Sequence, residues 1–565
     1  MINRLHVVML VFAVLFSLVL SKLFYWQIVK GSELKQEASY QYNGSKKITA
    51  TRGSILANDG TWLVANRTNW LLFAEIPLLD KSSKEIANIL APLIVENDYP
   101  SEDEYKLGLL QEIDRLQEMM DRKGAAWVPL KHRIPTDIKN KIEELNISGL
   151  GFDPEENRYY PEGSVSAQLL GFVGKDKDGN DTGYFGLEGY HNISLSGKDG
   201  FIQREKDLKG VPFVSSKTSE INSVPGTELV TYIDKRISNL ADIKLREGIE
   251  KYGAKEGSVV IMDPKTGGIL AMSSWPSYDP AKYNEYEGTL YRNPAISDNF
   301  EPGSVFKVIV MAAGIDAGVV EPDTKCDICD KPLKVDKYYI ETWDNKYHPD
   351  STMTDVIVHS DNVGMSFVAQ RLGEDKVYEY LDKFGIGKLS GVDLQGESNV
   401  PLRKKGTWNI VDLVTSSFGQ GVATTPMQLV RAVGAIANDG YLVTPQVVNN
   451  KKIEKVQIIS KEAADKMTEI MMDSATHGEA KWADIKGFRV AGKTGTAQIP
   501  IAGHYDAEKT IASFVGFAPA EDPKFVMIVT LKEPQSSPWA SETAAPLWYS
   551  ISRDLFNYFG IQPDN

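Results

Sequence analysis

Glu301-Pro-Gly-Ser-Val-Phe-Lys307 is the segment from which the architecture and chemistry of this chain are most readily predicted. Pro302-Gly303 predicts a turn, and the apolar run that follows predicts a helix entered from that turn. Ser304 would then lie near the N-terminus of the helix, where the backbone dipole favours a developing oxyanion. Lys307 follows three residues later on the same helical face, so its amine can reach the serine hydroxyl. The segment therefore predicts a serine nucleophile beside a lysine base.

Two further motifs follow in order, Ser360-Asp361-Asn362 and Lys493-Thr494-Gly495-Thr496. Each motif is weak alone, because an exposed serine–lysine pair, a helix cap or a turn would look the same. Each also has a second copy, at Ser32-Glu-Leu-Lys35, Ser297-Asp298-Asn299 and Lys265-Thr266-Gly267. These copies lie, respectively, close to a predicted membrane span, only seven residues before the nucleophile, and in a predicted hairpin turn. The first-named set therefore predicts one site.

The residue types of this set suit acyl transfer. A serine hydroxyl is a poor nucleophile until a base takes its proton. Lys307 can be that base only if burial or a neighbouring positive charge lowers its pKa, and Lys493 would supply such a charge. Ser360 would relay a proton to the leaving amine, and Asn362 would hold the substrate amide. The predicted catalytic residues are therefore Ser304, Lys307, Ser360, Asn362 and Lys493, with no metal and no cofactor.

Substrate binding is predicted for Thr494, Gly495 and Thr496. Gly495 would let a strand edge come close to the substrate, which can then pair as an added strand. Thr494 and Thr496 offer hydroxyls to a terminal carboxylate beside Lys493. The backbone N–H groups of Ser304 and Thr496 would form the oxyanion hole.

The trio of motifs is typical of penicillin-binding proteins and class A β-lactamases. The chain resembles class B penicillin-binding proteins, the monofunctional peptidoglycan D,D-transpeptidases, over nearly its whole length. The segments that carry the resemblance are Ala50-Thr51-Arg52-Gly53-Ser54-Ile55, Asn58-Asp59-Gly60, Arg158-Tyr159-Tyr160-Pro161, Gly171-Phe172-Val173-Gly174, Gly186-Leu187-Glu188-Gly189, Met262-Asp263-Pro264, Glu301-Pro302-Gly303-Ser304 and Phe418-Gly419-Gln420-Gly421. The chain departs from the family pattern at Ser238, where Gln is common, and at His477–Lys481, where a Gly-Thr-rich segment is expected.

This resemblance implies a reaction. Ser304 would form an acyl-enzyme on the D-Ala-D-Ala end of a stem peptide, release the terminal D-Ala and crosslink the peptide, and β-lactams would acylate the same serine. A D,D-carboxypeptidase or β-lactamase would share the nucleophile, but no glutamate can be assigned to activate the deacylating water of a class A β-lactamase. A non-catalytic cell-wall scaffold would tolerate loss of Ser304, yet all the catalytic residues are present. Glu301–Lys307 and His359–Gly364 resemble the division and sporulation branch more than the elongation branch.

The 565 residues predict two or three domains. We expect a cytoplasmic tail at residues 1–4, a transmembrane helix at 5–26, a pedestal (dimerisation-like) domain at 27–225 and a transpeptidase domain at 226–565. The predicted fold class is α+β, with an elongated mixed pedestal and a catalytic domain whose central antiparallel sheet is covered by helices. Helices are predicted at 83–94, 102–122 and 544–559, and strands at 258–262, 269–273, 489–499, 510–517 and 524–532.

The membrane span is predicted from the apolar run Leu5–Trp26, which is long enough to cross a hydrocarbon core of roughly 30 Å. The aromatic cluster Phe24-Tyr25-Trp26 suits the headgroup level of the membrane, and the Lys22 side chain can extend its amine to the same level. A cleaved signal peptide is the alternative, which the lack of a small-residue cleavage site disfavours. Charge does not set the orientation of the span; an extracytoplasmic catalytic domain is expected from the peptidoglycan chemistry.

The predicted partners are stem peptides, β-lactams and the cytoplasmic membrane. The net charge of −14 argues against nucleic acid, which would require a basic surface. The resemblance implies a membrane glycosyltransferase of the SEDS family (shape, elongation, division and sporulation) that docks on residues 27–225 and on Leu5–Trp26, together with other cell-wall and divisome proteins. A passive stalk is the alternative for residues 27–225. Cys326 and Cys329, the two cysteines, could form a local disulfide or stay as thiols.

Overall fold

The computed structural model describes residues 4–34, 43–95, 99–205, 219–450, 452–501 and 504–563. Residues 1–3 of the predicted tail and Lys35 of the second serine–lysine motif lie outside these ranges. The chain divides into two compact units, one made of Met1–Gly53 and Ser196–Thr227, the other of Ser54–Leu195 and Glu228–Asn565. Each unit is described separately.

The first unit begins with the helix α1 (Arg4–Phe24), which continues into one π-helical turn at Tyr25–Val29. Together these residues form a 26-residue segment that contains an 18-residue stretch with a mean hydropathy of 2.6, none of which is buried within the structure. Its length and composition suffice to cross a membrane, consistent with a single-pass anchor at the predicted position.

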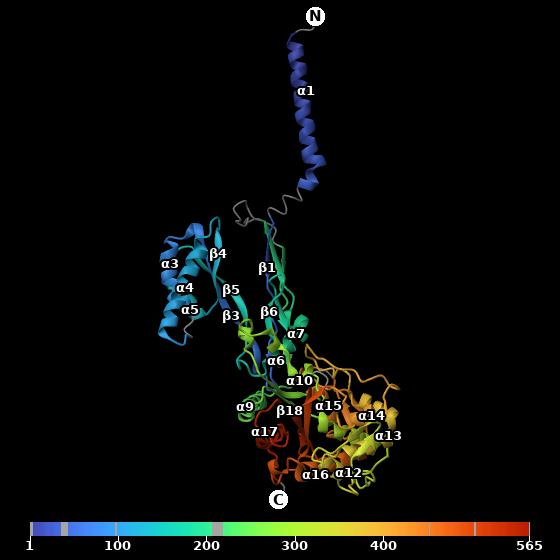
Figure 1. Cartoon of the computed structure of the whole chain (residues 1–565). Helices are drawn as coiled ribbons and strands as arrows, with labels where there is room; N and C mark the ends of the chain where they lie inside the picture. The colour runs from blue at the N-terminus through green and yellow to red at the C-terminus, as the bar shows by residue number, and fades with distance from the viewer. Residues whose placement is uncertain are drawn as a thin grey trace. The chain divides into compact units, whose positions relative to one another are not determined.

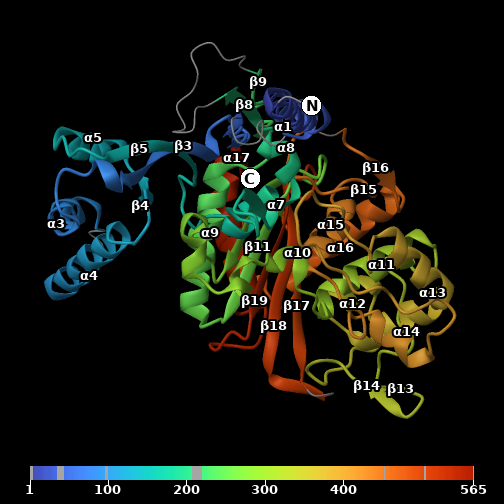
Figure 2. The same ribbon diagram turned by 90° about the horizontal axis from the view of Figure 1, so that it is seen from above.

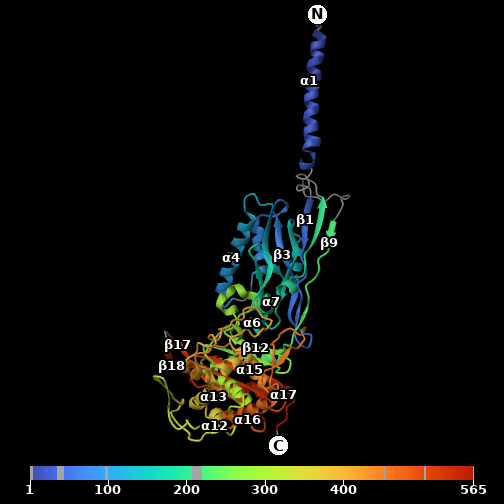
Figure 3. The ribbon, with the colours of Figure 1, turned by 90° about the vertical axis from the view of Figure 1, so that its right-hand side faces the viewer.

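The same unit contains a three-stranded antiparallel sheet in the order β1-β8-β9 (Figure 3). The strands are Asn43–Ile48, Gly200–Glu205 and Ser219–Ile221, which come from two distant parts of the sequence. Gly53 has a structural reason to be glycine, because a Cβ there would lie 2.0 Å from the carbonyl oxygen of Thr227. The segment Ala50–Ile55, which carries part of the family resemblance, is thus a close crossing of two chain segments.

The second unit opens with a five-stranded sheet of β2 (Ile55–Leu56), β3 (Trp62–Glu75), β4 (Trp127–Ile134), β5 (Leu150–Tyr159) and β10 (Leu229–Val230). Three helices accompany it, α3 (Ser83–Ile94), α4 (Glu102–Met120) and α5 (Thr136–Glu144) (Figure 1). Ser82 and Glu85 begin α3 with a capping box, in which each side chain accepts from the other residue's backbone N–H. The helices predicted at 83–94 and 102–122 are confirmed, the second ending two residues early.

The segment 185–189 of this region contacts the catalytic part of the same unit. Arg158 donates to the buried carboxylate of Glu188 at 2.7 Å. Gln395, far along the chain, accepts a hydrogen bond from the backbone N–H of Phe185 at 2.6 Å. A Cβ at Gly189 would lie 1.9 Å from the Gln395 side-chain oxygen, so only glycine leaves room for this contact. The family segment at 186–189 therefore contacts the catalytic part, and Arg158 of the segment 158–161 binds it through Glu188.

A second five-stranded sheet, entirely antiparallel, has the order β12-β11-β19-β18-β17. Its strands are β11 (Glu256–Met262), β12 (Ile269–Trp275), β17 (Ala491–Ile501), β18 (His504–Ala518) and β19 (Phe525–Lys532). All five predicted strands are present, and the predicted central antiparallel sheet is confirmed. Among the described residues, β17 pairs with a strand only on its β18 side and is therefore an edge strand.

Helices cover both faces of this sheet (Figure 2). The helices α9 (Lys235–Tyr252) and α17 (Ala544–Phe559) cover one face, and a larger helical layer covers the other. Successive residues of a strand point to opposite faces. In β19, Met527 therefore packs in the core with α9 and α17, whereas Ile528 packs in the core of the larger layer.

The remaining regular elements of the described ranges belong mostly to that larger layer. The helices are α6 (Ala167–Leu170), α7 (Gly186–Tyr190), α8 (Asn192–Ser196), α10 (Pro294–Ser297), α11 (Lys307–Asp316), α12 (Met353–Val358), α13 (Asn362–Lys383), α14 (Ile410–Ser416), α15 (Pro426–Ile436) and α16 (Lys461–His477). Three two-stranded antiparallel sheets pair β6 (Phe172–Lys175) with β7 (Asp181–Tyr184), β13 (Leu333–Val335) with β14 (Tyr338–Ile340), and β15 (Tyr441–Val443) with β16 (Lys455–Gln457).

Candidate active site

Ser304 lies in a single 3₁₀ turn, Gly303–Phe306, that leads directly into α11. The sequence predicted a helix entered from a turn here, and the structure refines this: the α-helix itself begins at Lys307. Gly303 has a φ of +58°, a conformation that glycine adopts without strain. Ser304 is partly exposed while Val305 and Phe306 are fully buried, so the serine lies at the surface of a rigid core.

A second glycine, Gly419, packs against the backbone of this turn. Gly303 donates its N–H to the carbonyl of Gly419 at 3.3 Å. A Cβ at Gly419 would lie 2.4 Å from the Gly303 carbonyl oxygen. The segment Phe418–Gly421, which the resemblance singled out, therefore supports the backbone that carries Ser304.

Lys307 is completely buried, with no part of the residue exposed. Its amine donates to the carbonyl oxygen of Ser360 at 2.5 Å and to the Ser360 hydroxyl at 3.2 Å. Burial, followed by the positive charge of Lys493, lowers the pKa of Lys307 to about 7, although Glu479 and Asp361 act in the opposite direction. At neutral pH a large share of these amines is therefore unprotonated and able to accept a proton.

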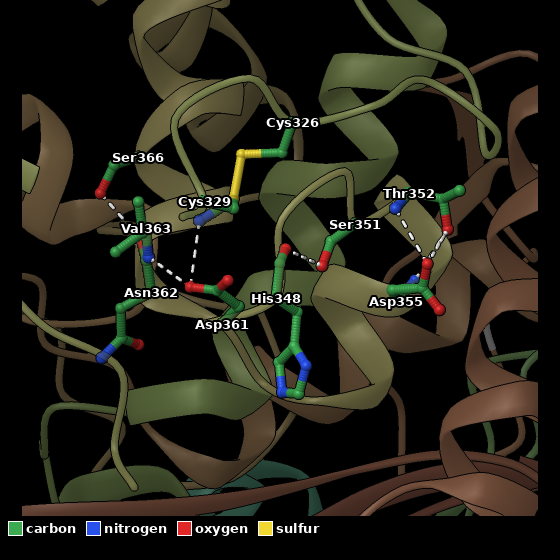
Figure 4. The surroundings of a disulfide bond; sticks show 11 residues. Cys326, Cys329, His348, Ser351, Thr352, Asp355, Asp361, Asn362, Val363 and Ser366 are labelled. Atoms are coloured by element: carbon green, nitrogen blue, oxygen red, sulfur yellow. Dashed lines mark hydrogen bonds between the residues drawn. A yellow bond between two sulfur atoms is a disulfide. The ribbon is translucent and has the colours of Figure 1, made fainter. Parts of the chain in front are cut away.

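Ser360 lies in the short connection between α12 and α13. Asn362 is the first residue of α13 and follows its cap, Asp361 (Figure 4). Ser360 has a φ of +56°, which is uncommon outside glycine and marks a constrained position. Asp361 caps α13, accepting from the backbone N–H groups of Val363 at 2.7 Å and Gly364 at 3.2 Å. Asn362 donates its side-chain amide to the carbonyl of Glu341 at 2.9 Å. The middle residue of this motif is thus a helix cap that fixes its two neighbours.

Lys493 and Thr494 lie on the edge strand β17 and are buried. The Lys493 amine donates to the Thr494 hydroxyl at 3.0 Å and to the Thr494 carbonyl at 3.2 Å. Burial lowers the pKa of Lys493, and the negative charge of Glu479 partly offsets this. The site thus contains two buried lysines, Lys307 at the start of α11 and Lys493 on β17.

Gly495 brings β17 against the turn that carries the serine. A Cβ at Gly495 would lie 2.7 Å from Cγ1 of Val305 and 2.9 Å from its backbone nitrogen. The structure therefore gives a packing reason for this glycine; room for a bound substrate, the reason expected from the sequence, stays a prediction. Thr496, the next residue but one after Thr494, accepts the N–H of Ala540 on its hydroxyl at 3.0 Å.

Sequence reasoning missed Glu479, which follows α16. Its carboxylate accepts a hydrogen bond from the Thr494 hydroxyl at 2.6 Å. The only signal in the sequence was the departure from the family pattern at His477–Lys481, with nothing to connect that segment to a residue 15 positions later.

Two tryptophans distant in the sequence also meet beside the motifs. Trp343 and Trp539 have ring centroids 5.3 Å apart, and the Trp343 indole N–H donates to the carbonyl of His359 at 3.2 Å. A cavity of about 290 Å³ lies on the same side, and its lining includes Trp343, His359, Asp361 and Glu479. The neighbourhood of the motifs is therefore partly aromatic and has room for a ligand group.

Cys326 and Cys329 form a disulfide, which decides between the two states left open by the sequence (Figure 4). Both residues are buried in the larger helical layer.

A serine in a turn before a buried helix, a buried lysine hydrogen-bonded to a second serine, and an edge strand with a second lysine define the class of serine acyl-transferring enzymes with this fold. Comparison with known families agrees. The penicillin-binding protein transpeptidase domain matches residues 257–553, and the penicillin-binding protein dimerisation domain matches residues 47–231. The chain belongs to the class B penicillin-binding proteins.

Named relatives are similar over most of their length. Stage V sporulation protein D of Bacillus subtilis is 30% identical over 99% of this chain and 86% of its own. The probable peptidoglycan D,D-transpeptidase PenA of Neisseria meningitidis is 30% identical over 99% of this chain and 94% of its own. Peptidoglycan D,D-transpeptidase FtsI of Buchnera aphidicola is 31% identical over 78% of this chain and 77% of its own.

Solved structures share the fold at lower identity. Penicillin-binding protein 2X of Streptococcus thermophilus has a TM-score of 0.74 at 23% identity, covering 92% of this chain and 80% of that one. Penicillin-binding protein 3 of Mycobacterium tuberculosis, solved with aztreonam, has a TM-score of 0.68 at 24% identity, covering 92% and 98%. At these identities the likeness supports the predicted α+β architecture.

Proposed function

We propose that this chain is a peptidoglycan D,D-transpeptidase with Ser304 as its nucleophile. The observation that carries the proposal is the buried Lys307 amine, held on Ser360 beside the turn that bears Ser304, with its pKa lowered to about 7. A base with a pKa near the working pH is the most effective in proton transfer. The relatives named peptidoglycan D,D-transpeptidase support the substrate class.

In the proposed reaction, the Ser304 oxygen attacks the carbonyl carbon between the two D-Ala residues while its proton passes to the Lys307 amine. The C–N bond then breaks, and the proton moves through the Ser360 hydroxyl to the departing D-Ala amine. An amine of a second stem peptide next attacks the acyl-enzyme carbonyl and gives a proton to Lys307. The ester C–O bond then breaks, and Lys307 passes this proton to the Ser304 oxygen, which restores the hydroxyl. The proposed oxyanion hole is the pair of backbone N–H groups of Ser304 and Thr496.

The other site residues have proposed binding roles. Asn362 would give up its hydrogen bond to a backbone carbonyl and hold the substrate amide. Lys493 and Thr496 would hold the terminal carboxylate, with Thr494 lining the same subsite, and the strand edge at Gly495 would let the stem peptide pair with β17.

Hydrolysis is the competing function, and the lifetime of the acyl-enzyme distinguishes the two. We expect the purified full chain, acylated by benzylpenicillin, to keep its adduct for many minutes, because no group is assigned to activate a deacylating water. Intact-mass spectrometry over time measures the adduct. Turnover within seconds would instead identify a β-lactamase or carboxypeptidase.

The proposed organisation places residues 226–565 as the transpeptidase domain outside the cytoplasmic membrane and residues 27–225 as its pedestal. Residues 5–26 would span the membrane, with residues 1–4 in the cytoplasm. Lipid-linked peptidoglycan precursors are polymerised on the outer side, so the nucleophile must be there to reach stem peptides.

We further propose a partner, a SEDS-family membrane glycosyltransferase of the division or sporulation type, together with other cell-wall and divisome proteins. The names of the relatives in sporulation and division support this branch. Tethering the crosslinker to the polymerase would raise the effective concentration of nascent strands at Ser304.

Replacing residues 27–225 by an unrelated rigid spacer, with residues 1–26 and 226–565 kept, tests this partner. We expect co-purification of the polymerase and septal recruitment to be lost, while the membrane anchor still inserts. Penicillin labelling of the chimera is the control for a folded catalytic part. If co-purification and wall crosslinking both survive in a labelling-competent chimera, residues 27–225 are a passive stalk.

A further inference from the structure

Glu479 lies where the end of α16 meets the edge strand β17. It comes directly after Gly478, which ends the helix. The residue is partly exposed, and its carboxylate oxygen lies 2.6 Å from the hydroxyl of Thr494, which itself is buried. A carboxylate of the protein therefore contacts the subsite proposed for the carboxylate of the substrate.

The hydrogen bonds of Thr494 leave it without a proton for a ligand. A threonine hydroxyl has one proton to donate and two lone pairs to accept with. In the structure the proton goes to Glu479, and the Lys493 amine donates to the same oxygen at 3.0 Å. Thr494 is thus occupied on both sides by neighbouring residues.

Thr496 is arranged in the opposite way. Its hydroxyl accepts from the backbone N–H of Ala540 at 3.0 Å, which orients the oxygen and leaves the proton available to a ligand. Of the two threonines expected to hold a terminal carboxylate, Thr496 is therefore the one equipped to donate.

The charge of Glu479, like its hydrogen bond to Thr494, disfavours a second carboxylate at this subsite. Its negative charge reaches both buried lysines, raising the pKa of Lys307 and of Lys493 against the larger effect of burial. A second carboxylate brought to this place would meet like charge in a site of low polarisability.

We propose that Glu479 determines the ligand selectivity of this subsite: its carboxylate holds the Thr494 hydroxyl and opposes a second anion, so that the carboxylate of a ligand is held by Thr496 and Lys493. Glu479 is thus a specificity-determining residue that reduces the advantage of anionic over neutral ligands. The inference rests on the proposed function, because it assumes that the ligand carboxylate lies at this subsite.

The test compares two probes that differ in that charge and in one methyl group, benzylpenicillin and its methyl ester. The second-order rate constant of acylation is measured for both with the full chain, and the ratio of anion to ester is formed for each variant. Since each ratio is internal to one preparation, partial loss of folded protein cancels. We expect the ratio to rise about tenfold in Glu479→Gln, which keeps the size of the side chain and removes its charge.

Two further variants make the result specific. Glu479→Asp keeps the charge, so its ratio is expected to stay within about threefold of the wild-type ratio. Asp473→Asn removes an equal charge from an exposed position on α16 and is expected to leave the ratio unchanged.

A ratio that does not move in Glu479→Gln, or that falls, overturns the proposal; a fall would mean that Glu479 serves to keep Lys493 charged. Failure of the proposed function has a different signature, because benzylpenicillin would then leave Ser304 of the wild-type chain unlabelled. Labelling of Ser304 with an unchanged ratio refutes the selectivity role alone.

Discussion

Replacing Lys307 by Ala is expected to slow acylation by benzylpenicillin by about 10²–10⁴-fold. The substitution removes the amine that is buried against Ser360 and leaves the Ser304 hydroxyl without a base. Stopped-flow or gel-based labelling of the full chain measures the rate constant. In the wild-type chain the same rate should rise with pH through about 7, because the base works only when its amine is neutral and burial places its pKa there.

Lys307→Arg is the informative control for this prediction. It keeps a positive charge and hydrogen-bond donors at the same place, but a guanidinium does not lose its proton in proteins. We therefore expect it to be as slow as the alanine variant. Near-normal acylation in the arginine variant would show that Lys307 acts through its charge, and near-normal acylation in the alanine variant would remove it from the mechanism.

Replacing Lys493 by Ala is expected to slow acylation by about 10- to 100-fold at pH 7, through two effects. It removes a cation from the proposed carboxylate subsite. It also removes the positive charge that helps to lower the pKa of Lys307, so that pKa rises and fewer Lys307 amines are neutral at pH 7. The second effect has a signature, since the deficit should shrink as the pH is raised above 7.

The second copy of the motif supplies a matched control. Lys265→Ala changes the lysine of Lys265-Thr266-Gly267, which is exposed and paired with Asp522. We expect its rate and pH profile to match those of the wild-type chain. If Lys493→Ala lowered acylation equally at every pH, the electrostatic coupling between the two buried lysines would be refuted, leaving a role in binding alone.

Much of the catalytic fold could be predicted from the sequence because its strands and helices have regular apolar patterns. The strands around 258–273 and 524–532 matched closely, because burial against a core on each face makes them nearly continuous apolar runs. β18 begins at His504, six residues before the predicted start, because its polar first residues have no apolar pattern and are strand only through pairing with the end of β17.

Pairings between distant segments could not be predicted. β1 and β8 lie more than 150 residues apart in the sequence and pair in one sheet. The residue pattern of neither strand identifies the other as its partner. The site shows the same limit. Ser304 and Lys307 could be related through helical spacing, whereas the contact of Glu479 with Thr494 depends on how α16 ends beside β17.

Mass spectrometry of the penicillin-labelled chain identifies the nucleophile. The purified full chain is incubated with benzylpenicillin and digested, and the modified peptide is sequenced, with Ser304→Ala treated in parallel. Ser297→Ala, a change in the second copy of the Ser-Asp-Asn motif, is the control for a neighbouring buried serine. The account predicts one adduct, on Ser304, lost in Ser304→Ala and kept in Ser297→Ala. An adduct on any other residue, or labelling that persists in Ser304→Ala, would contradict it.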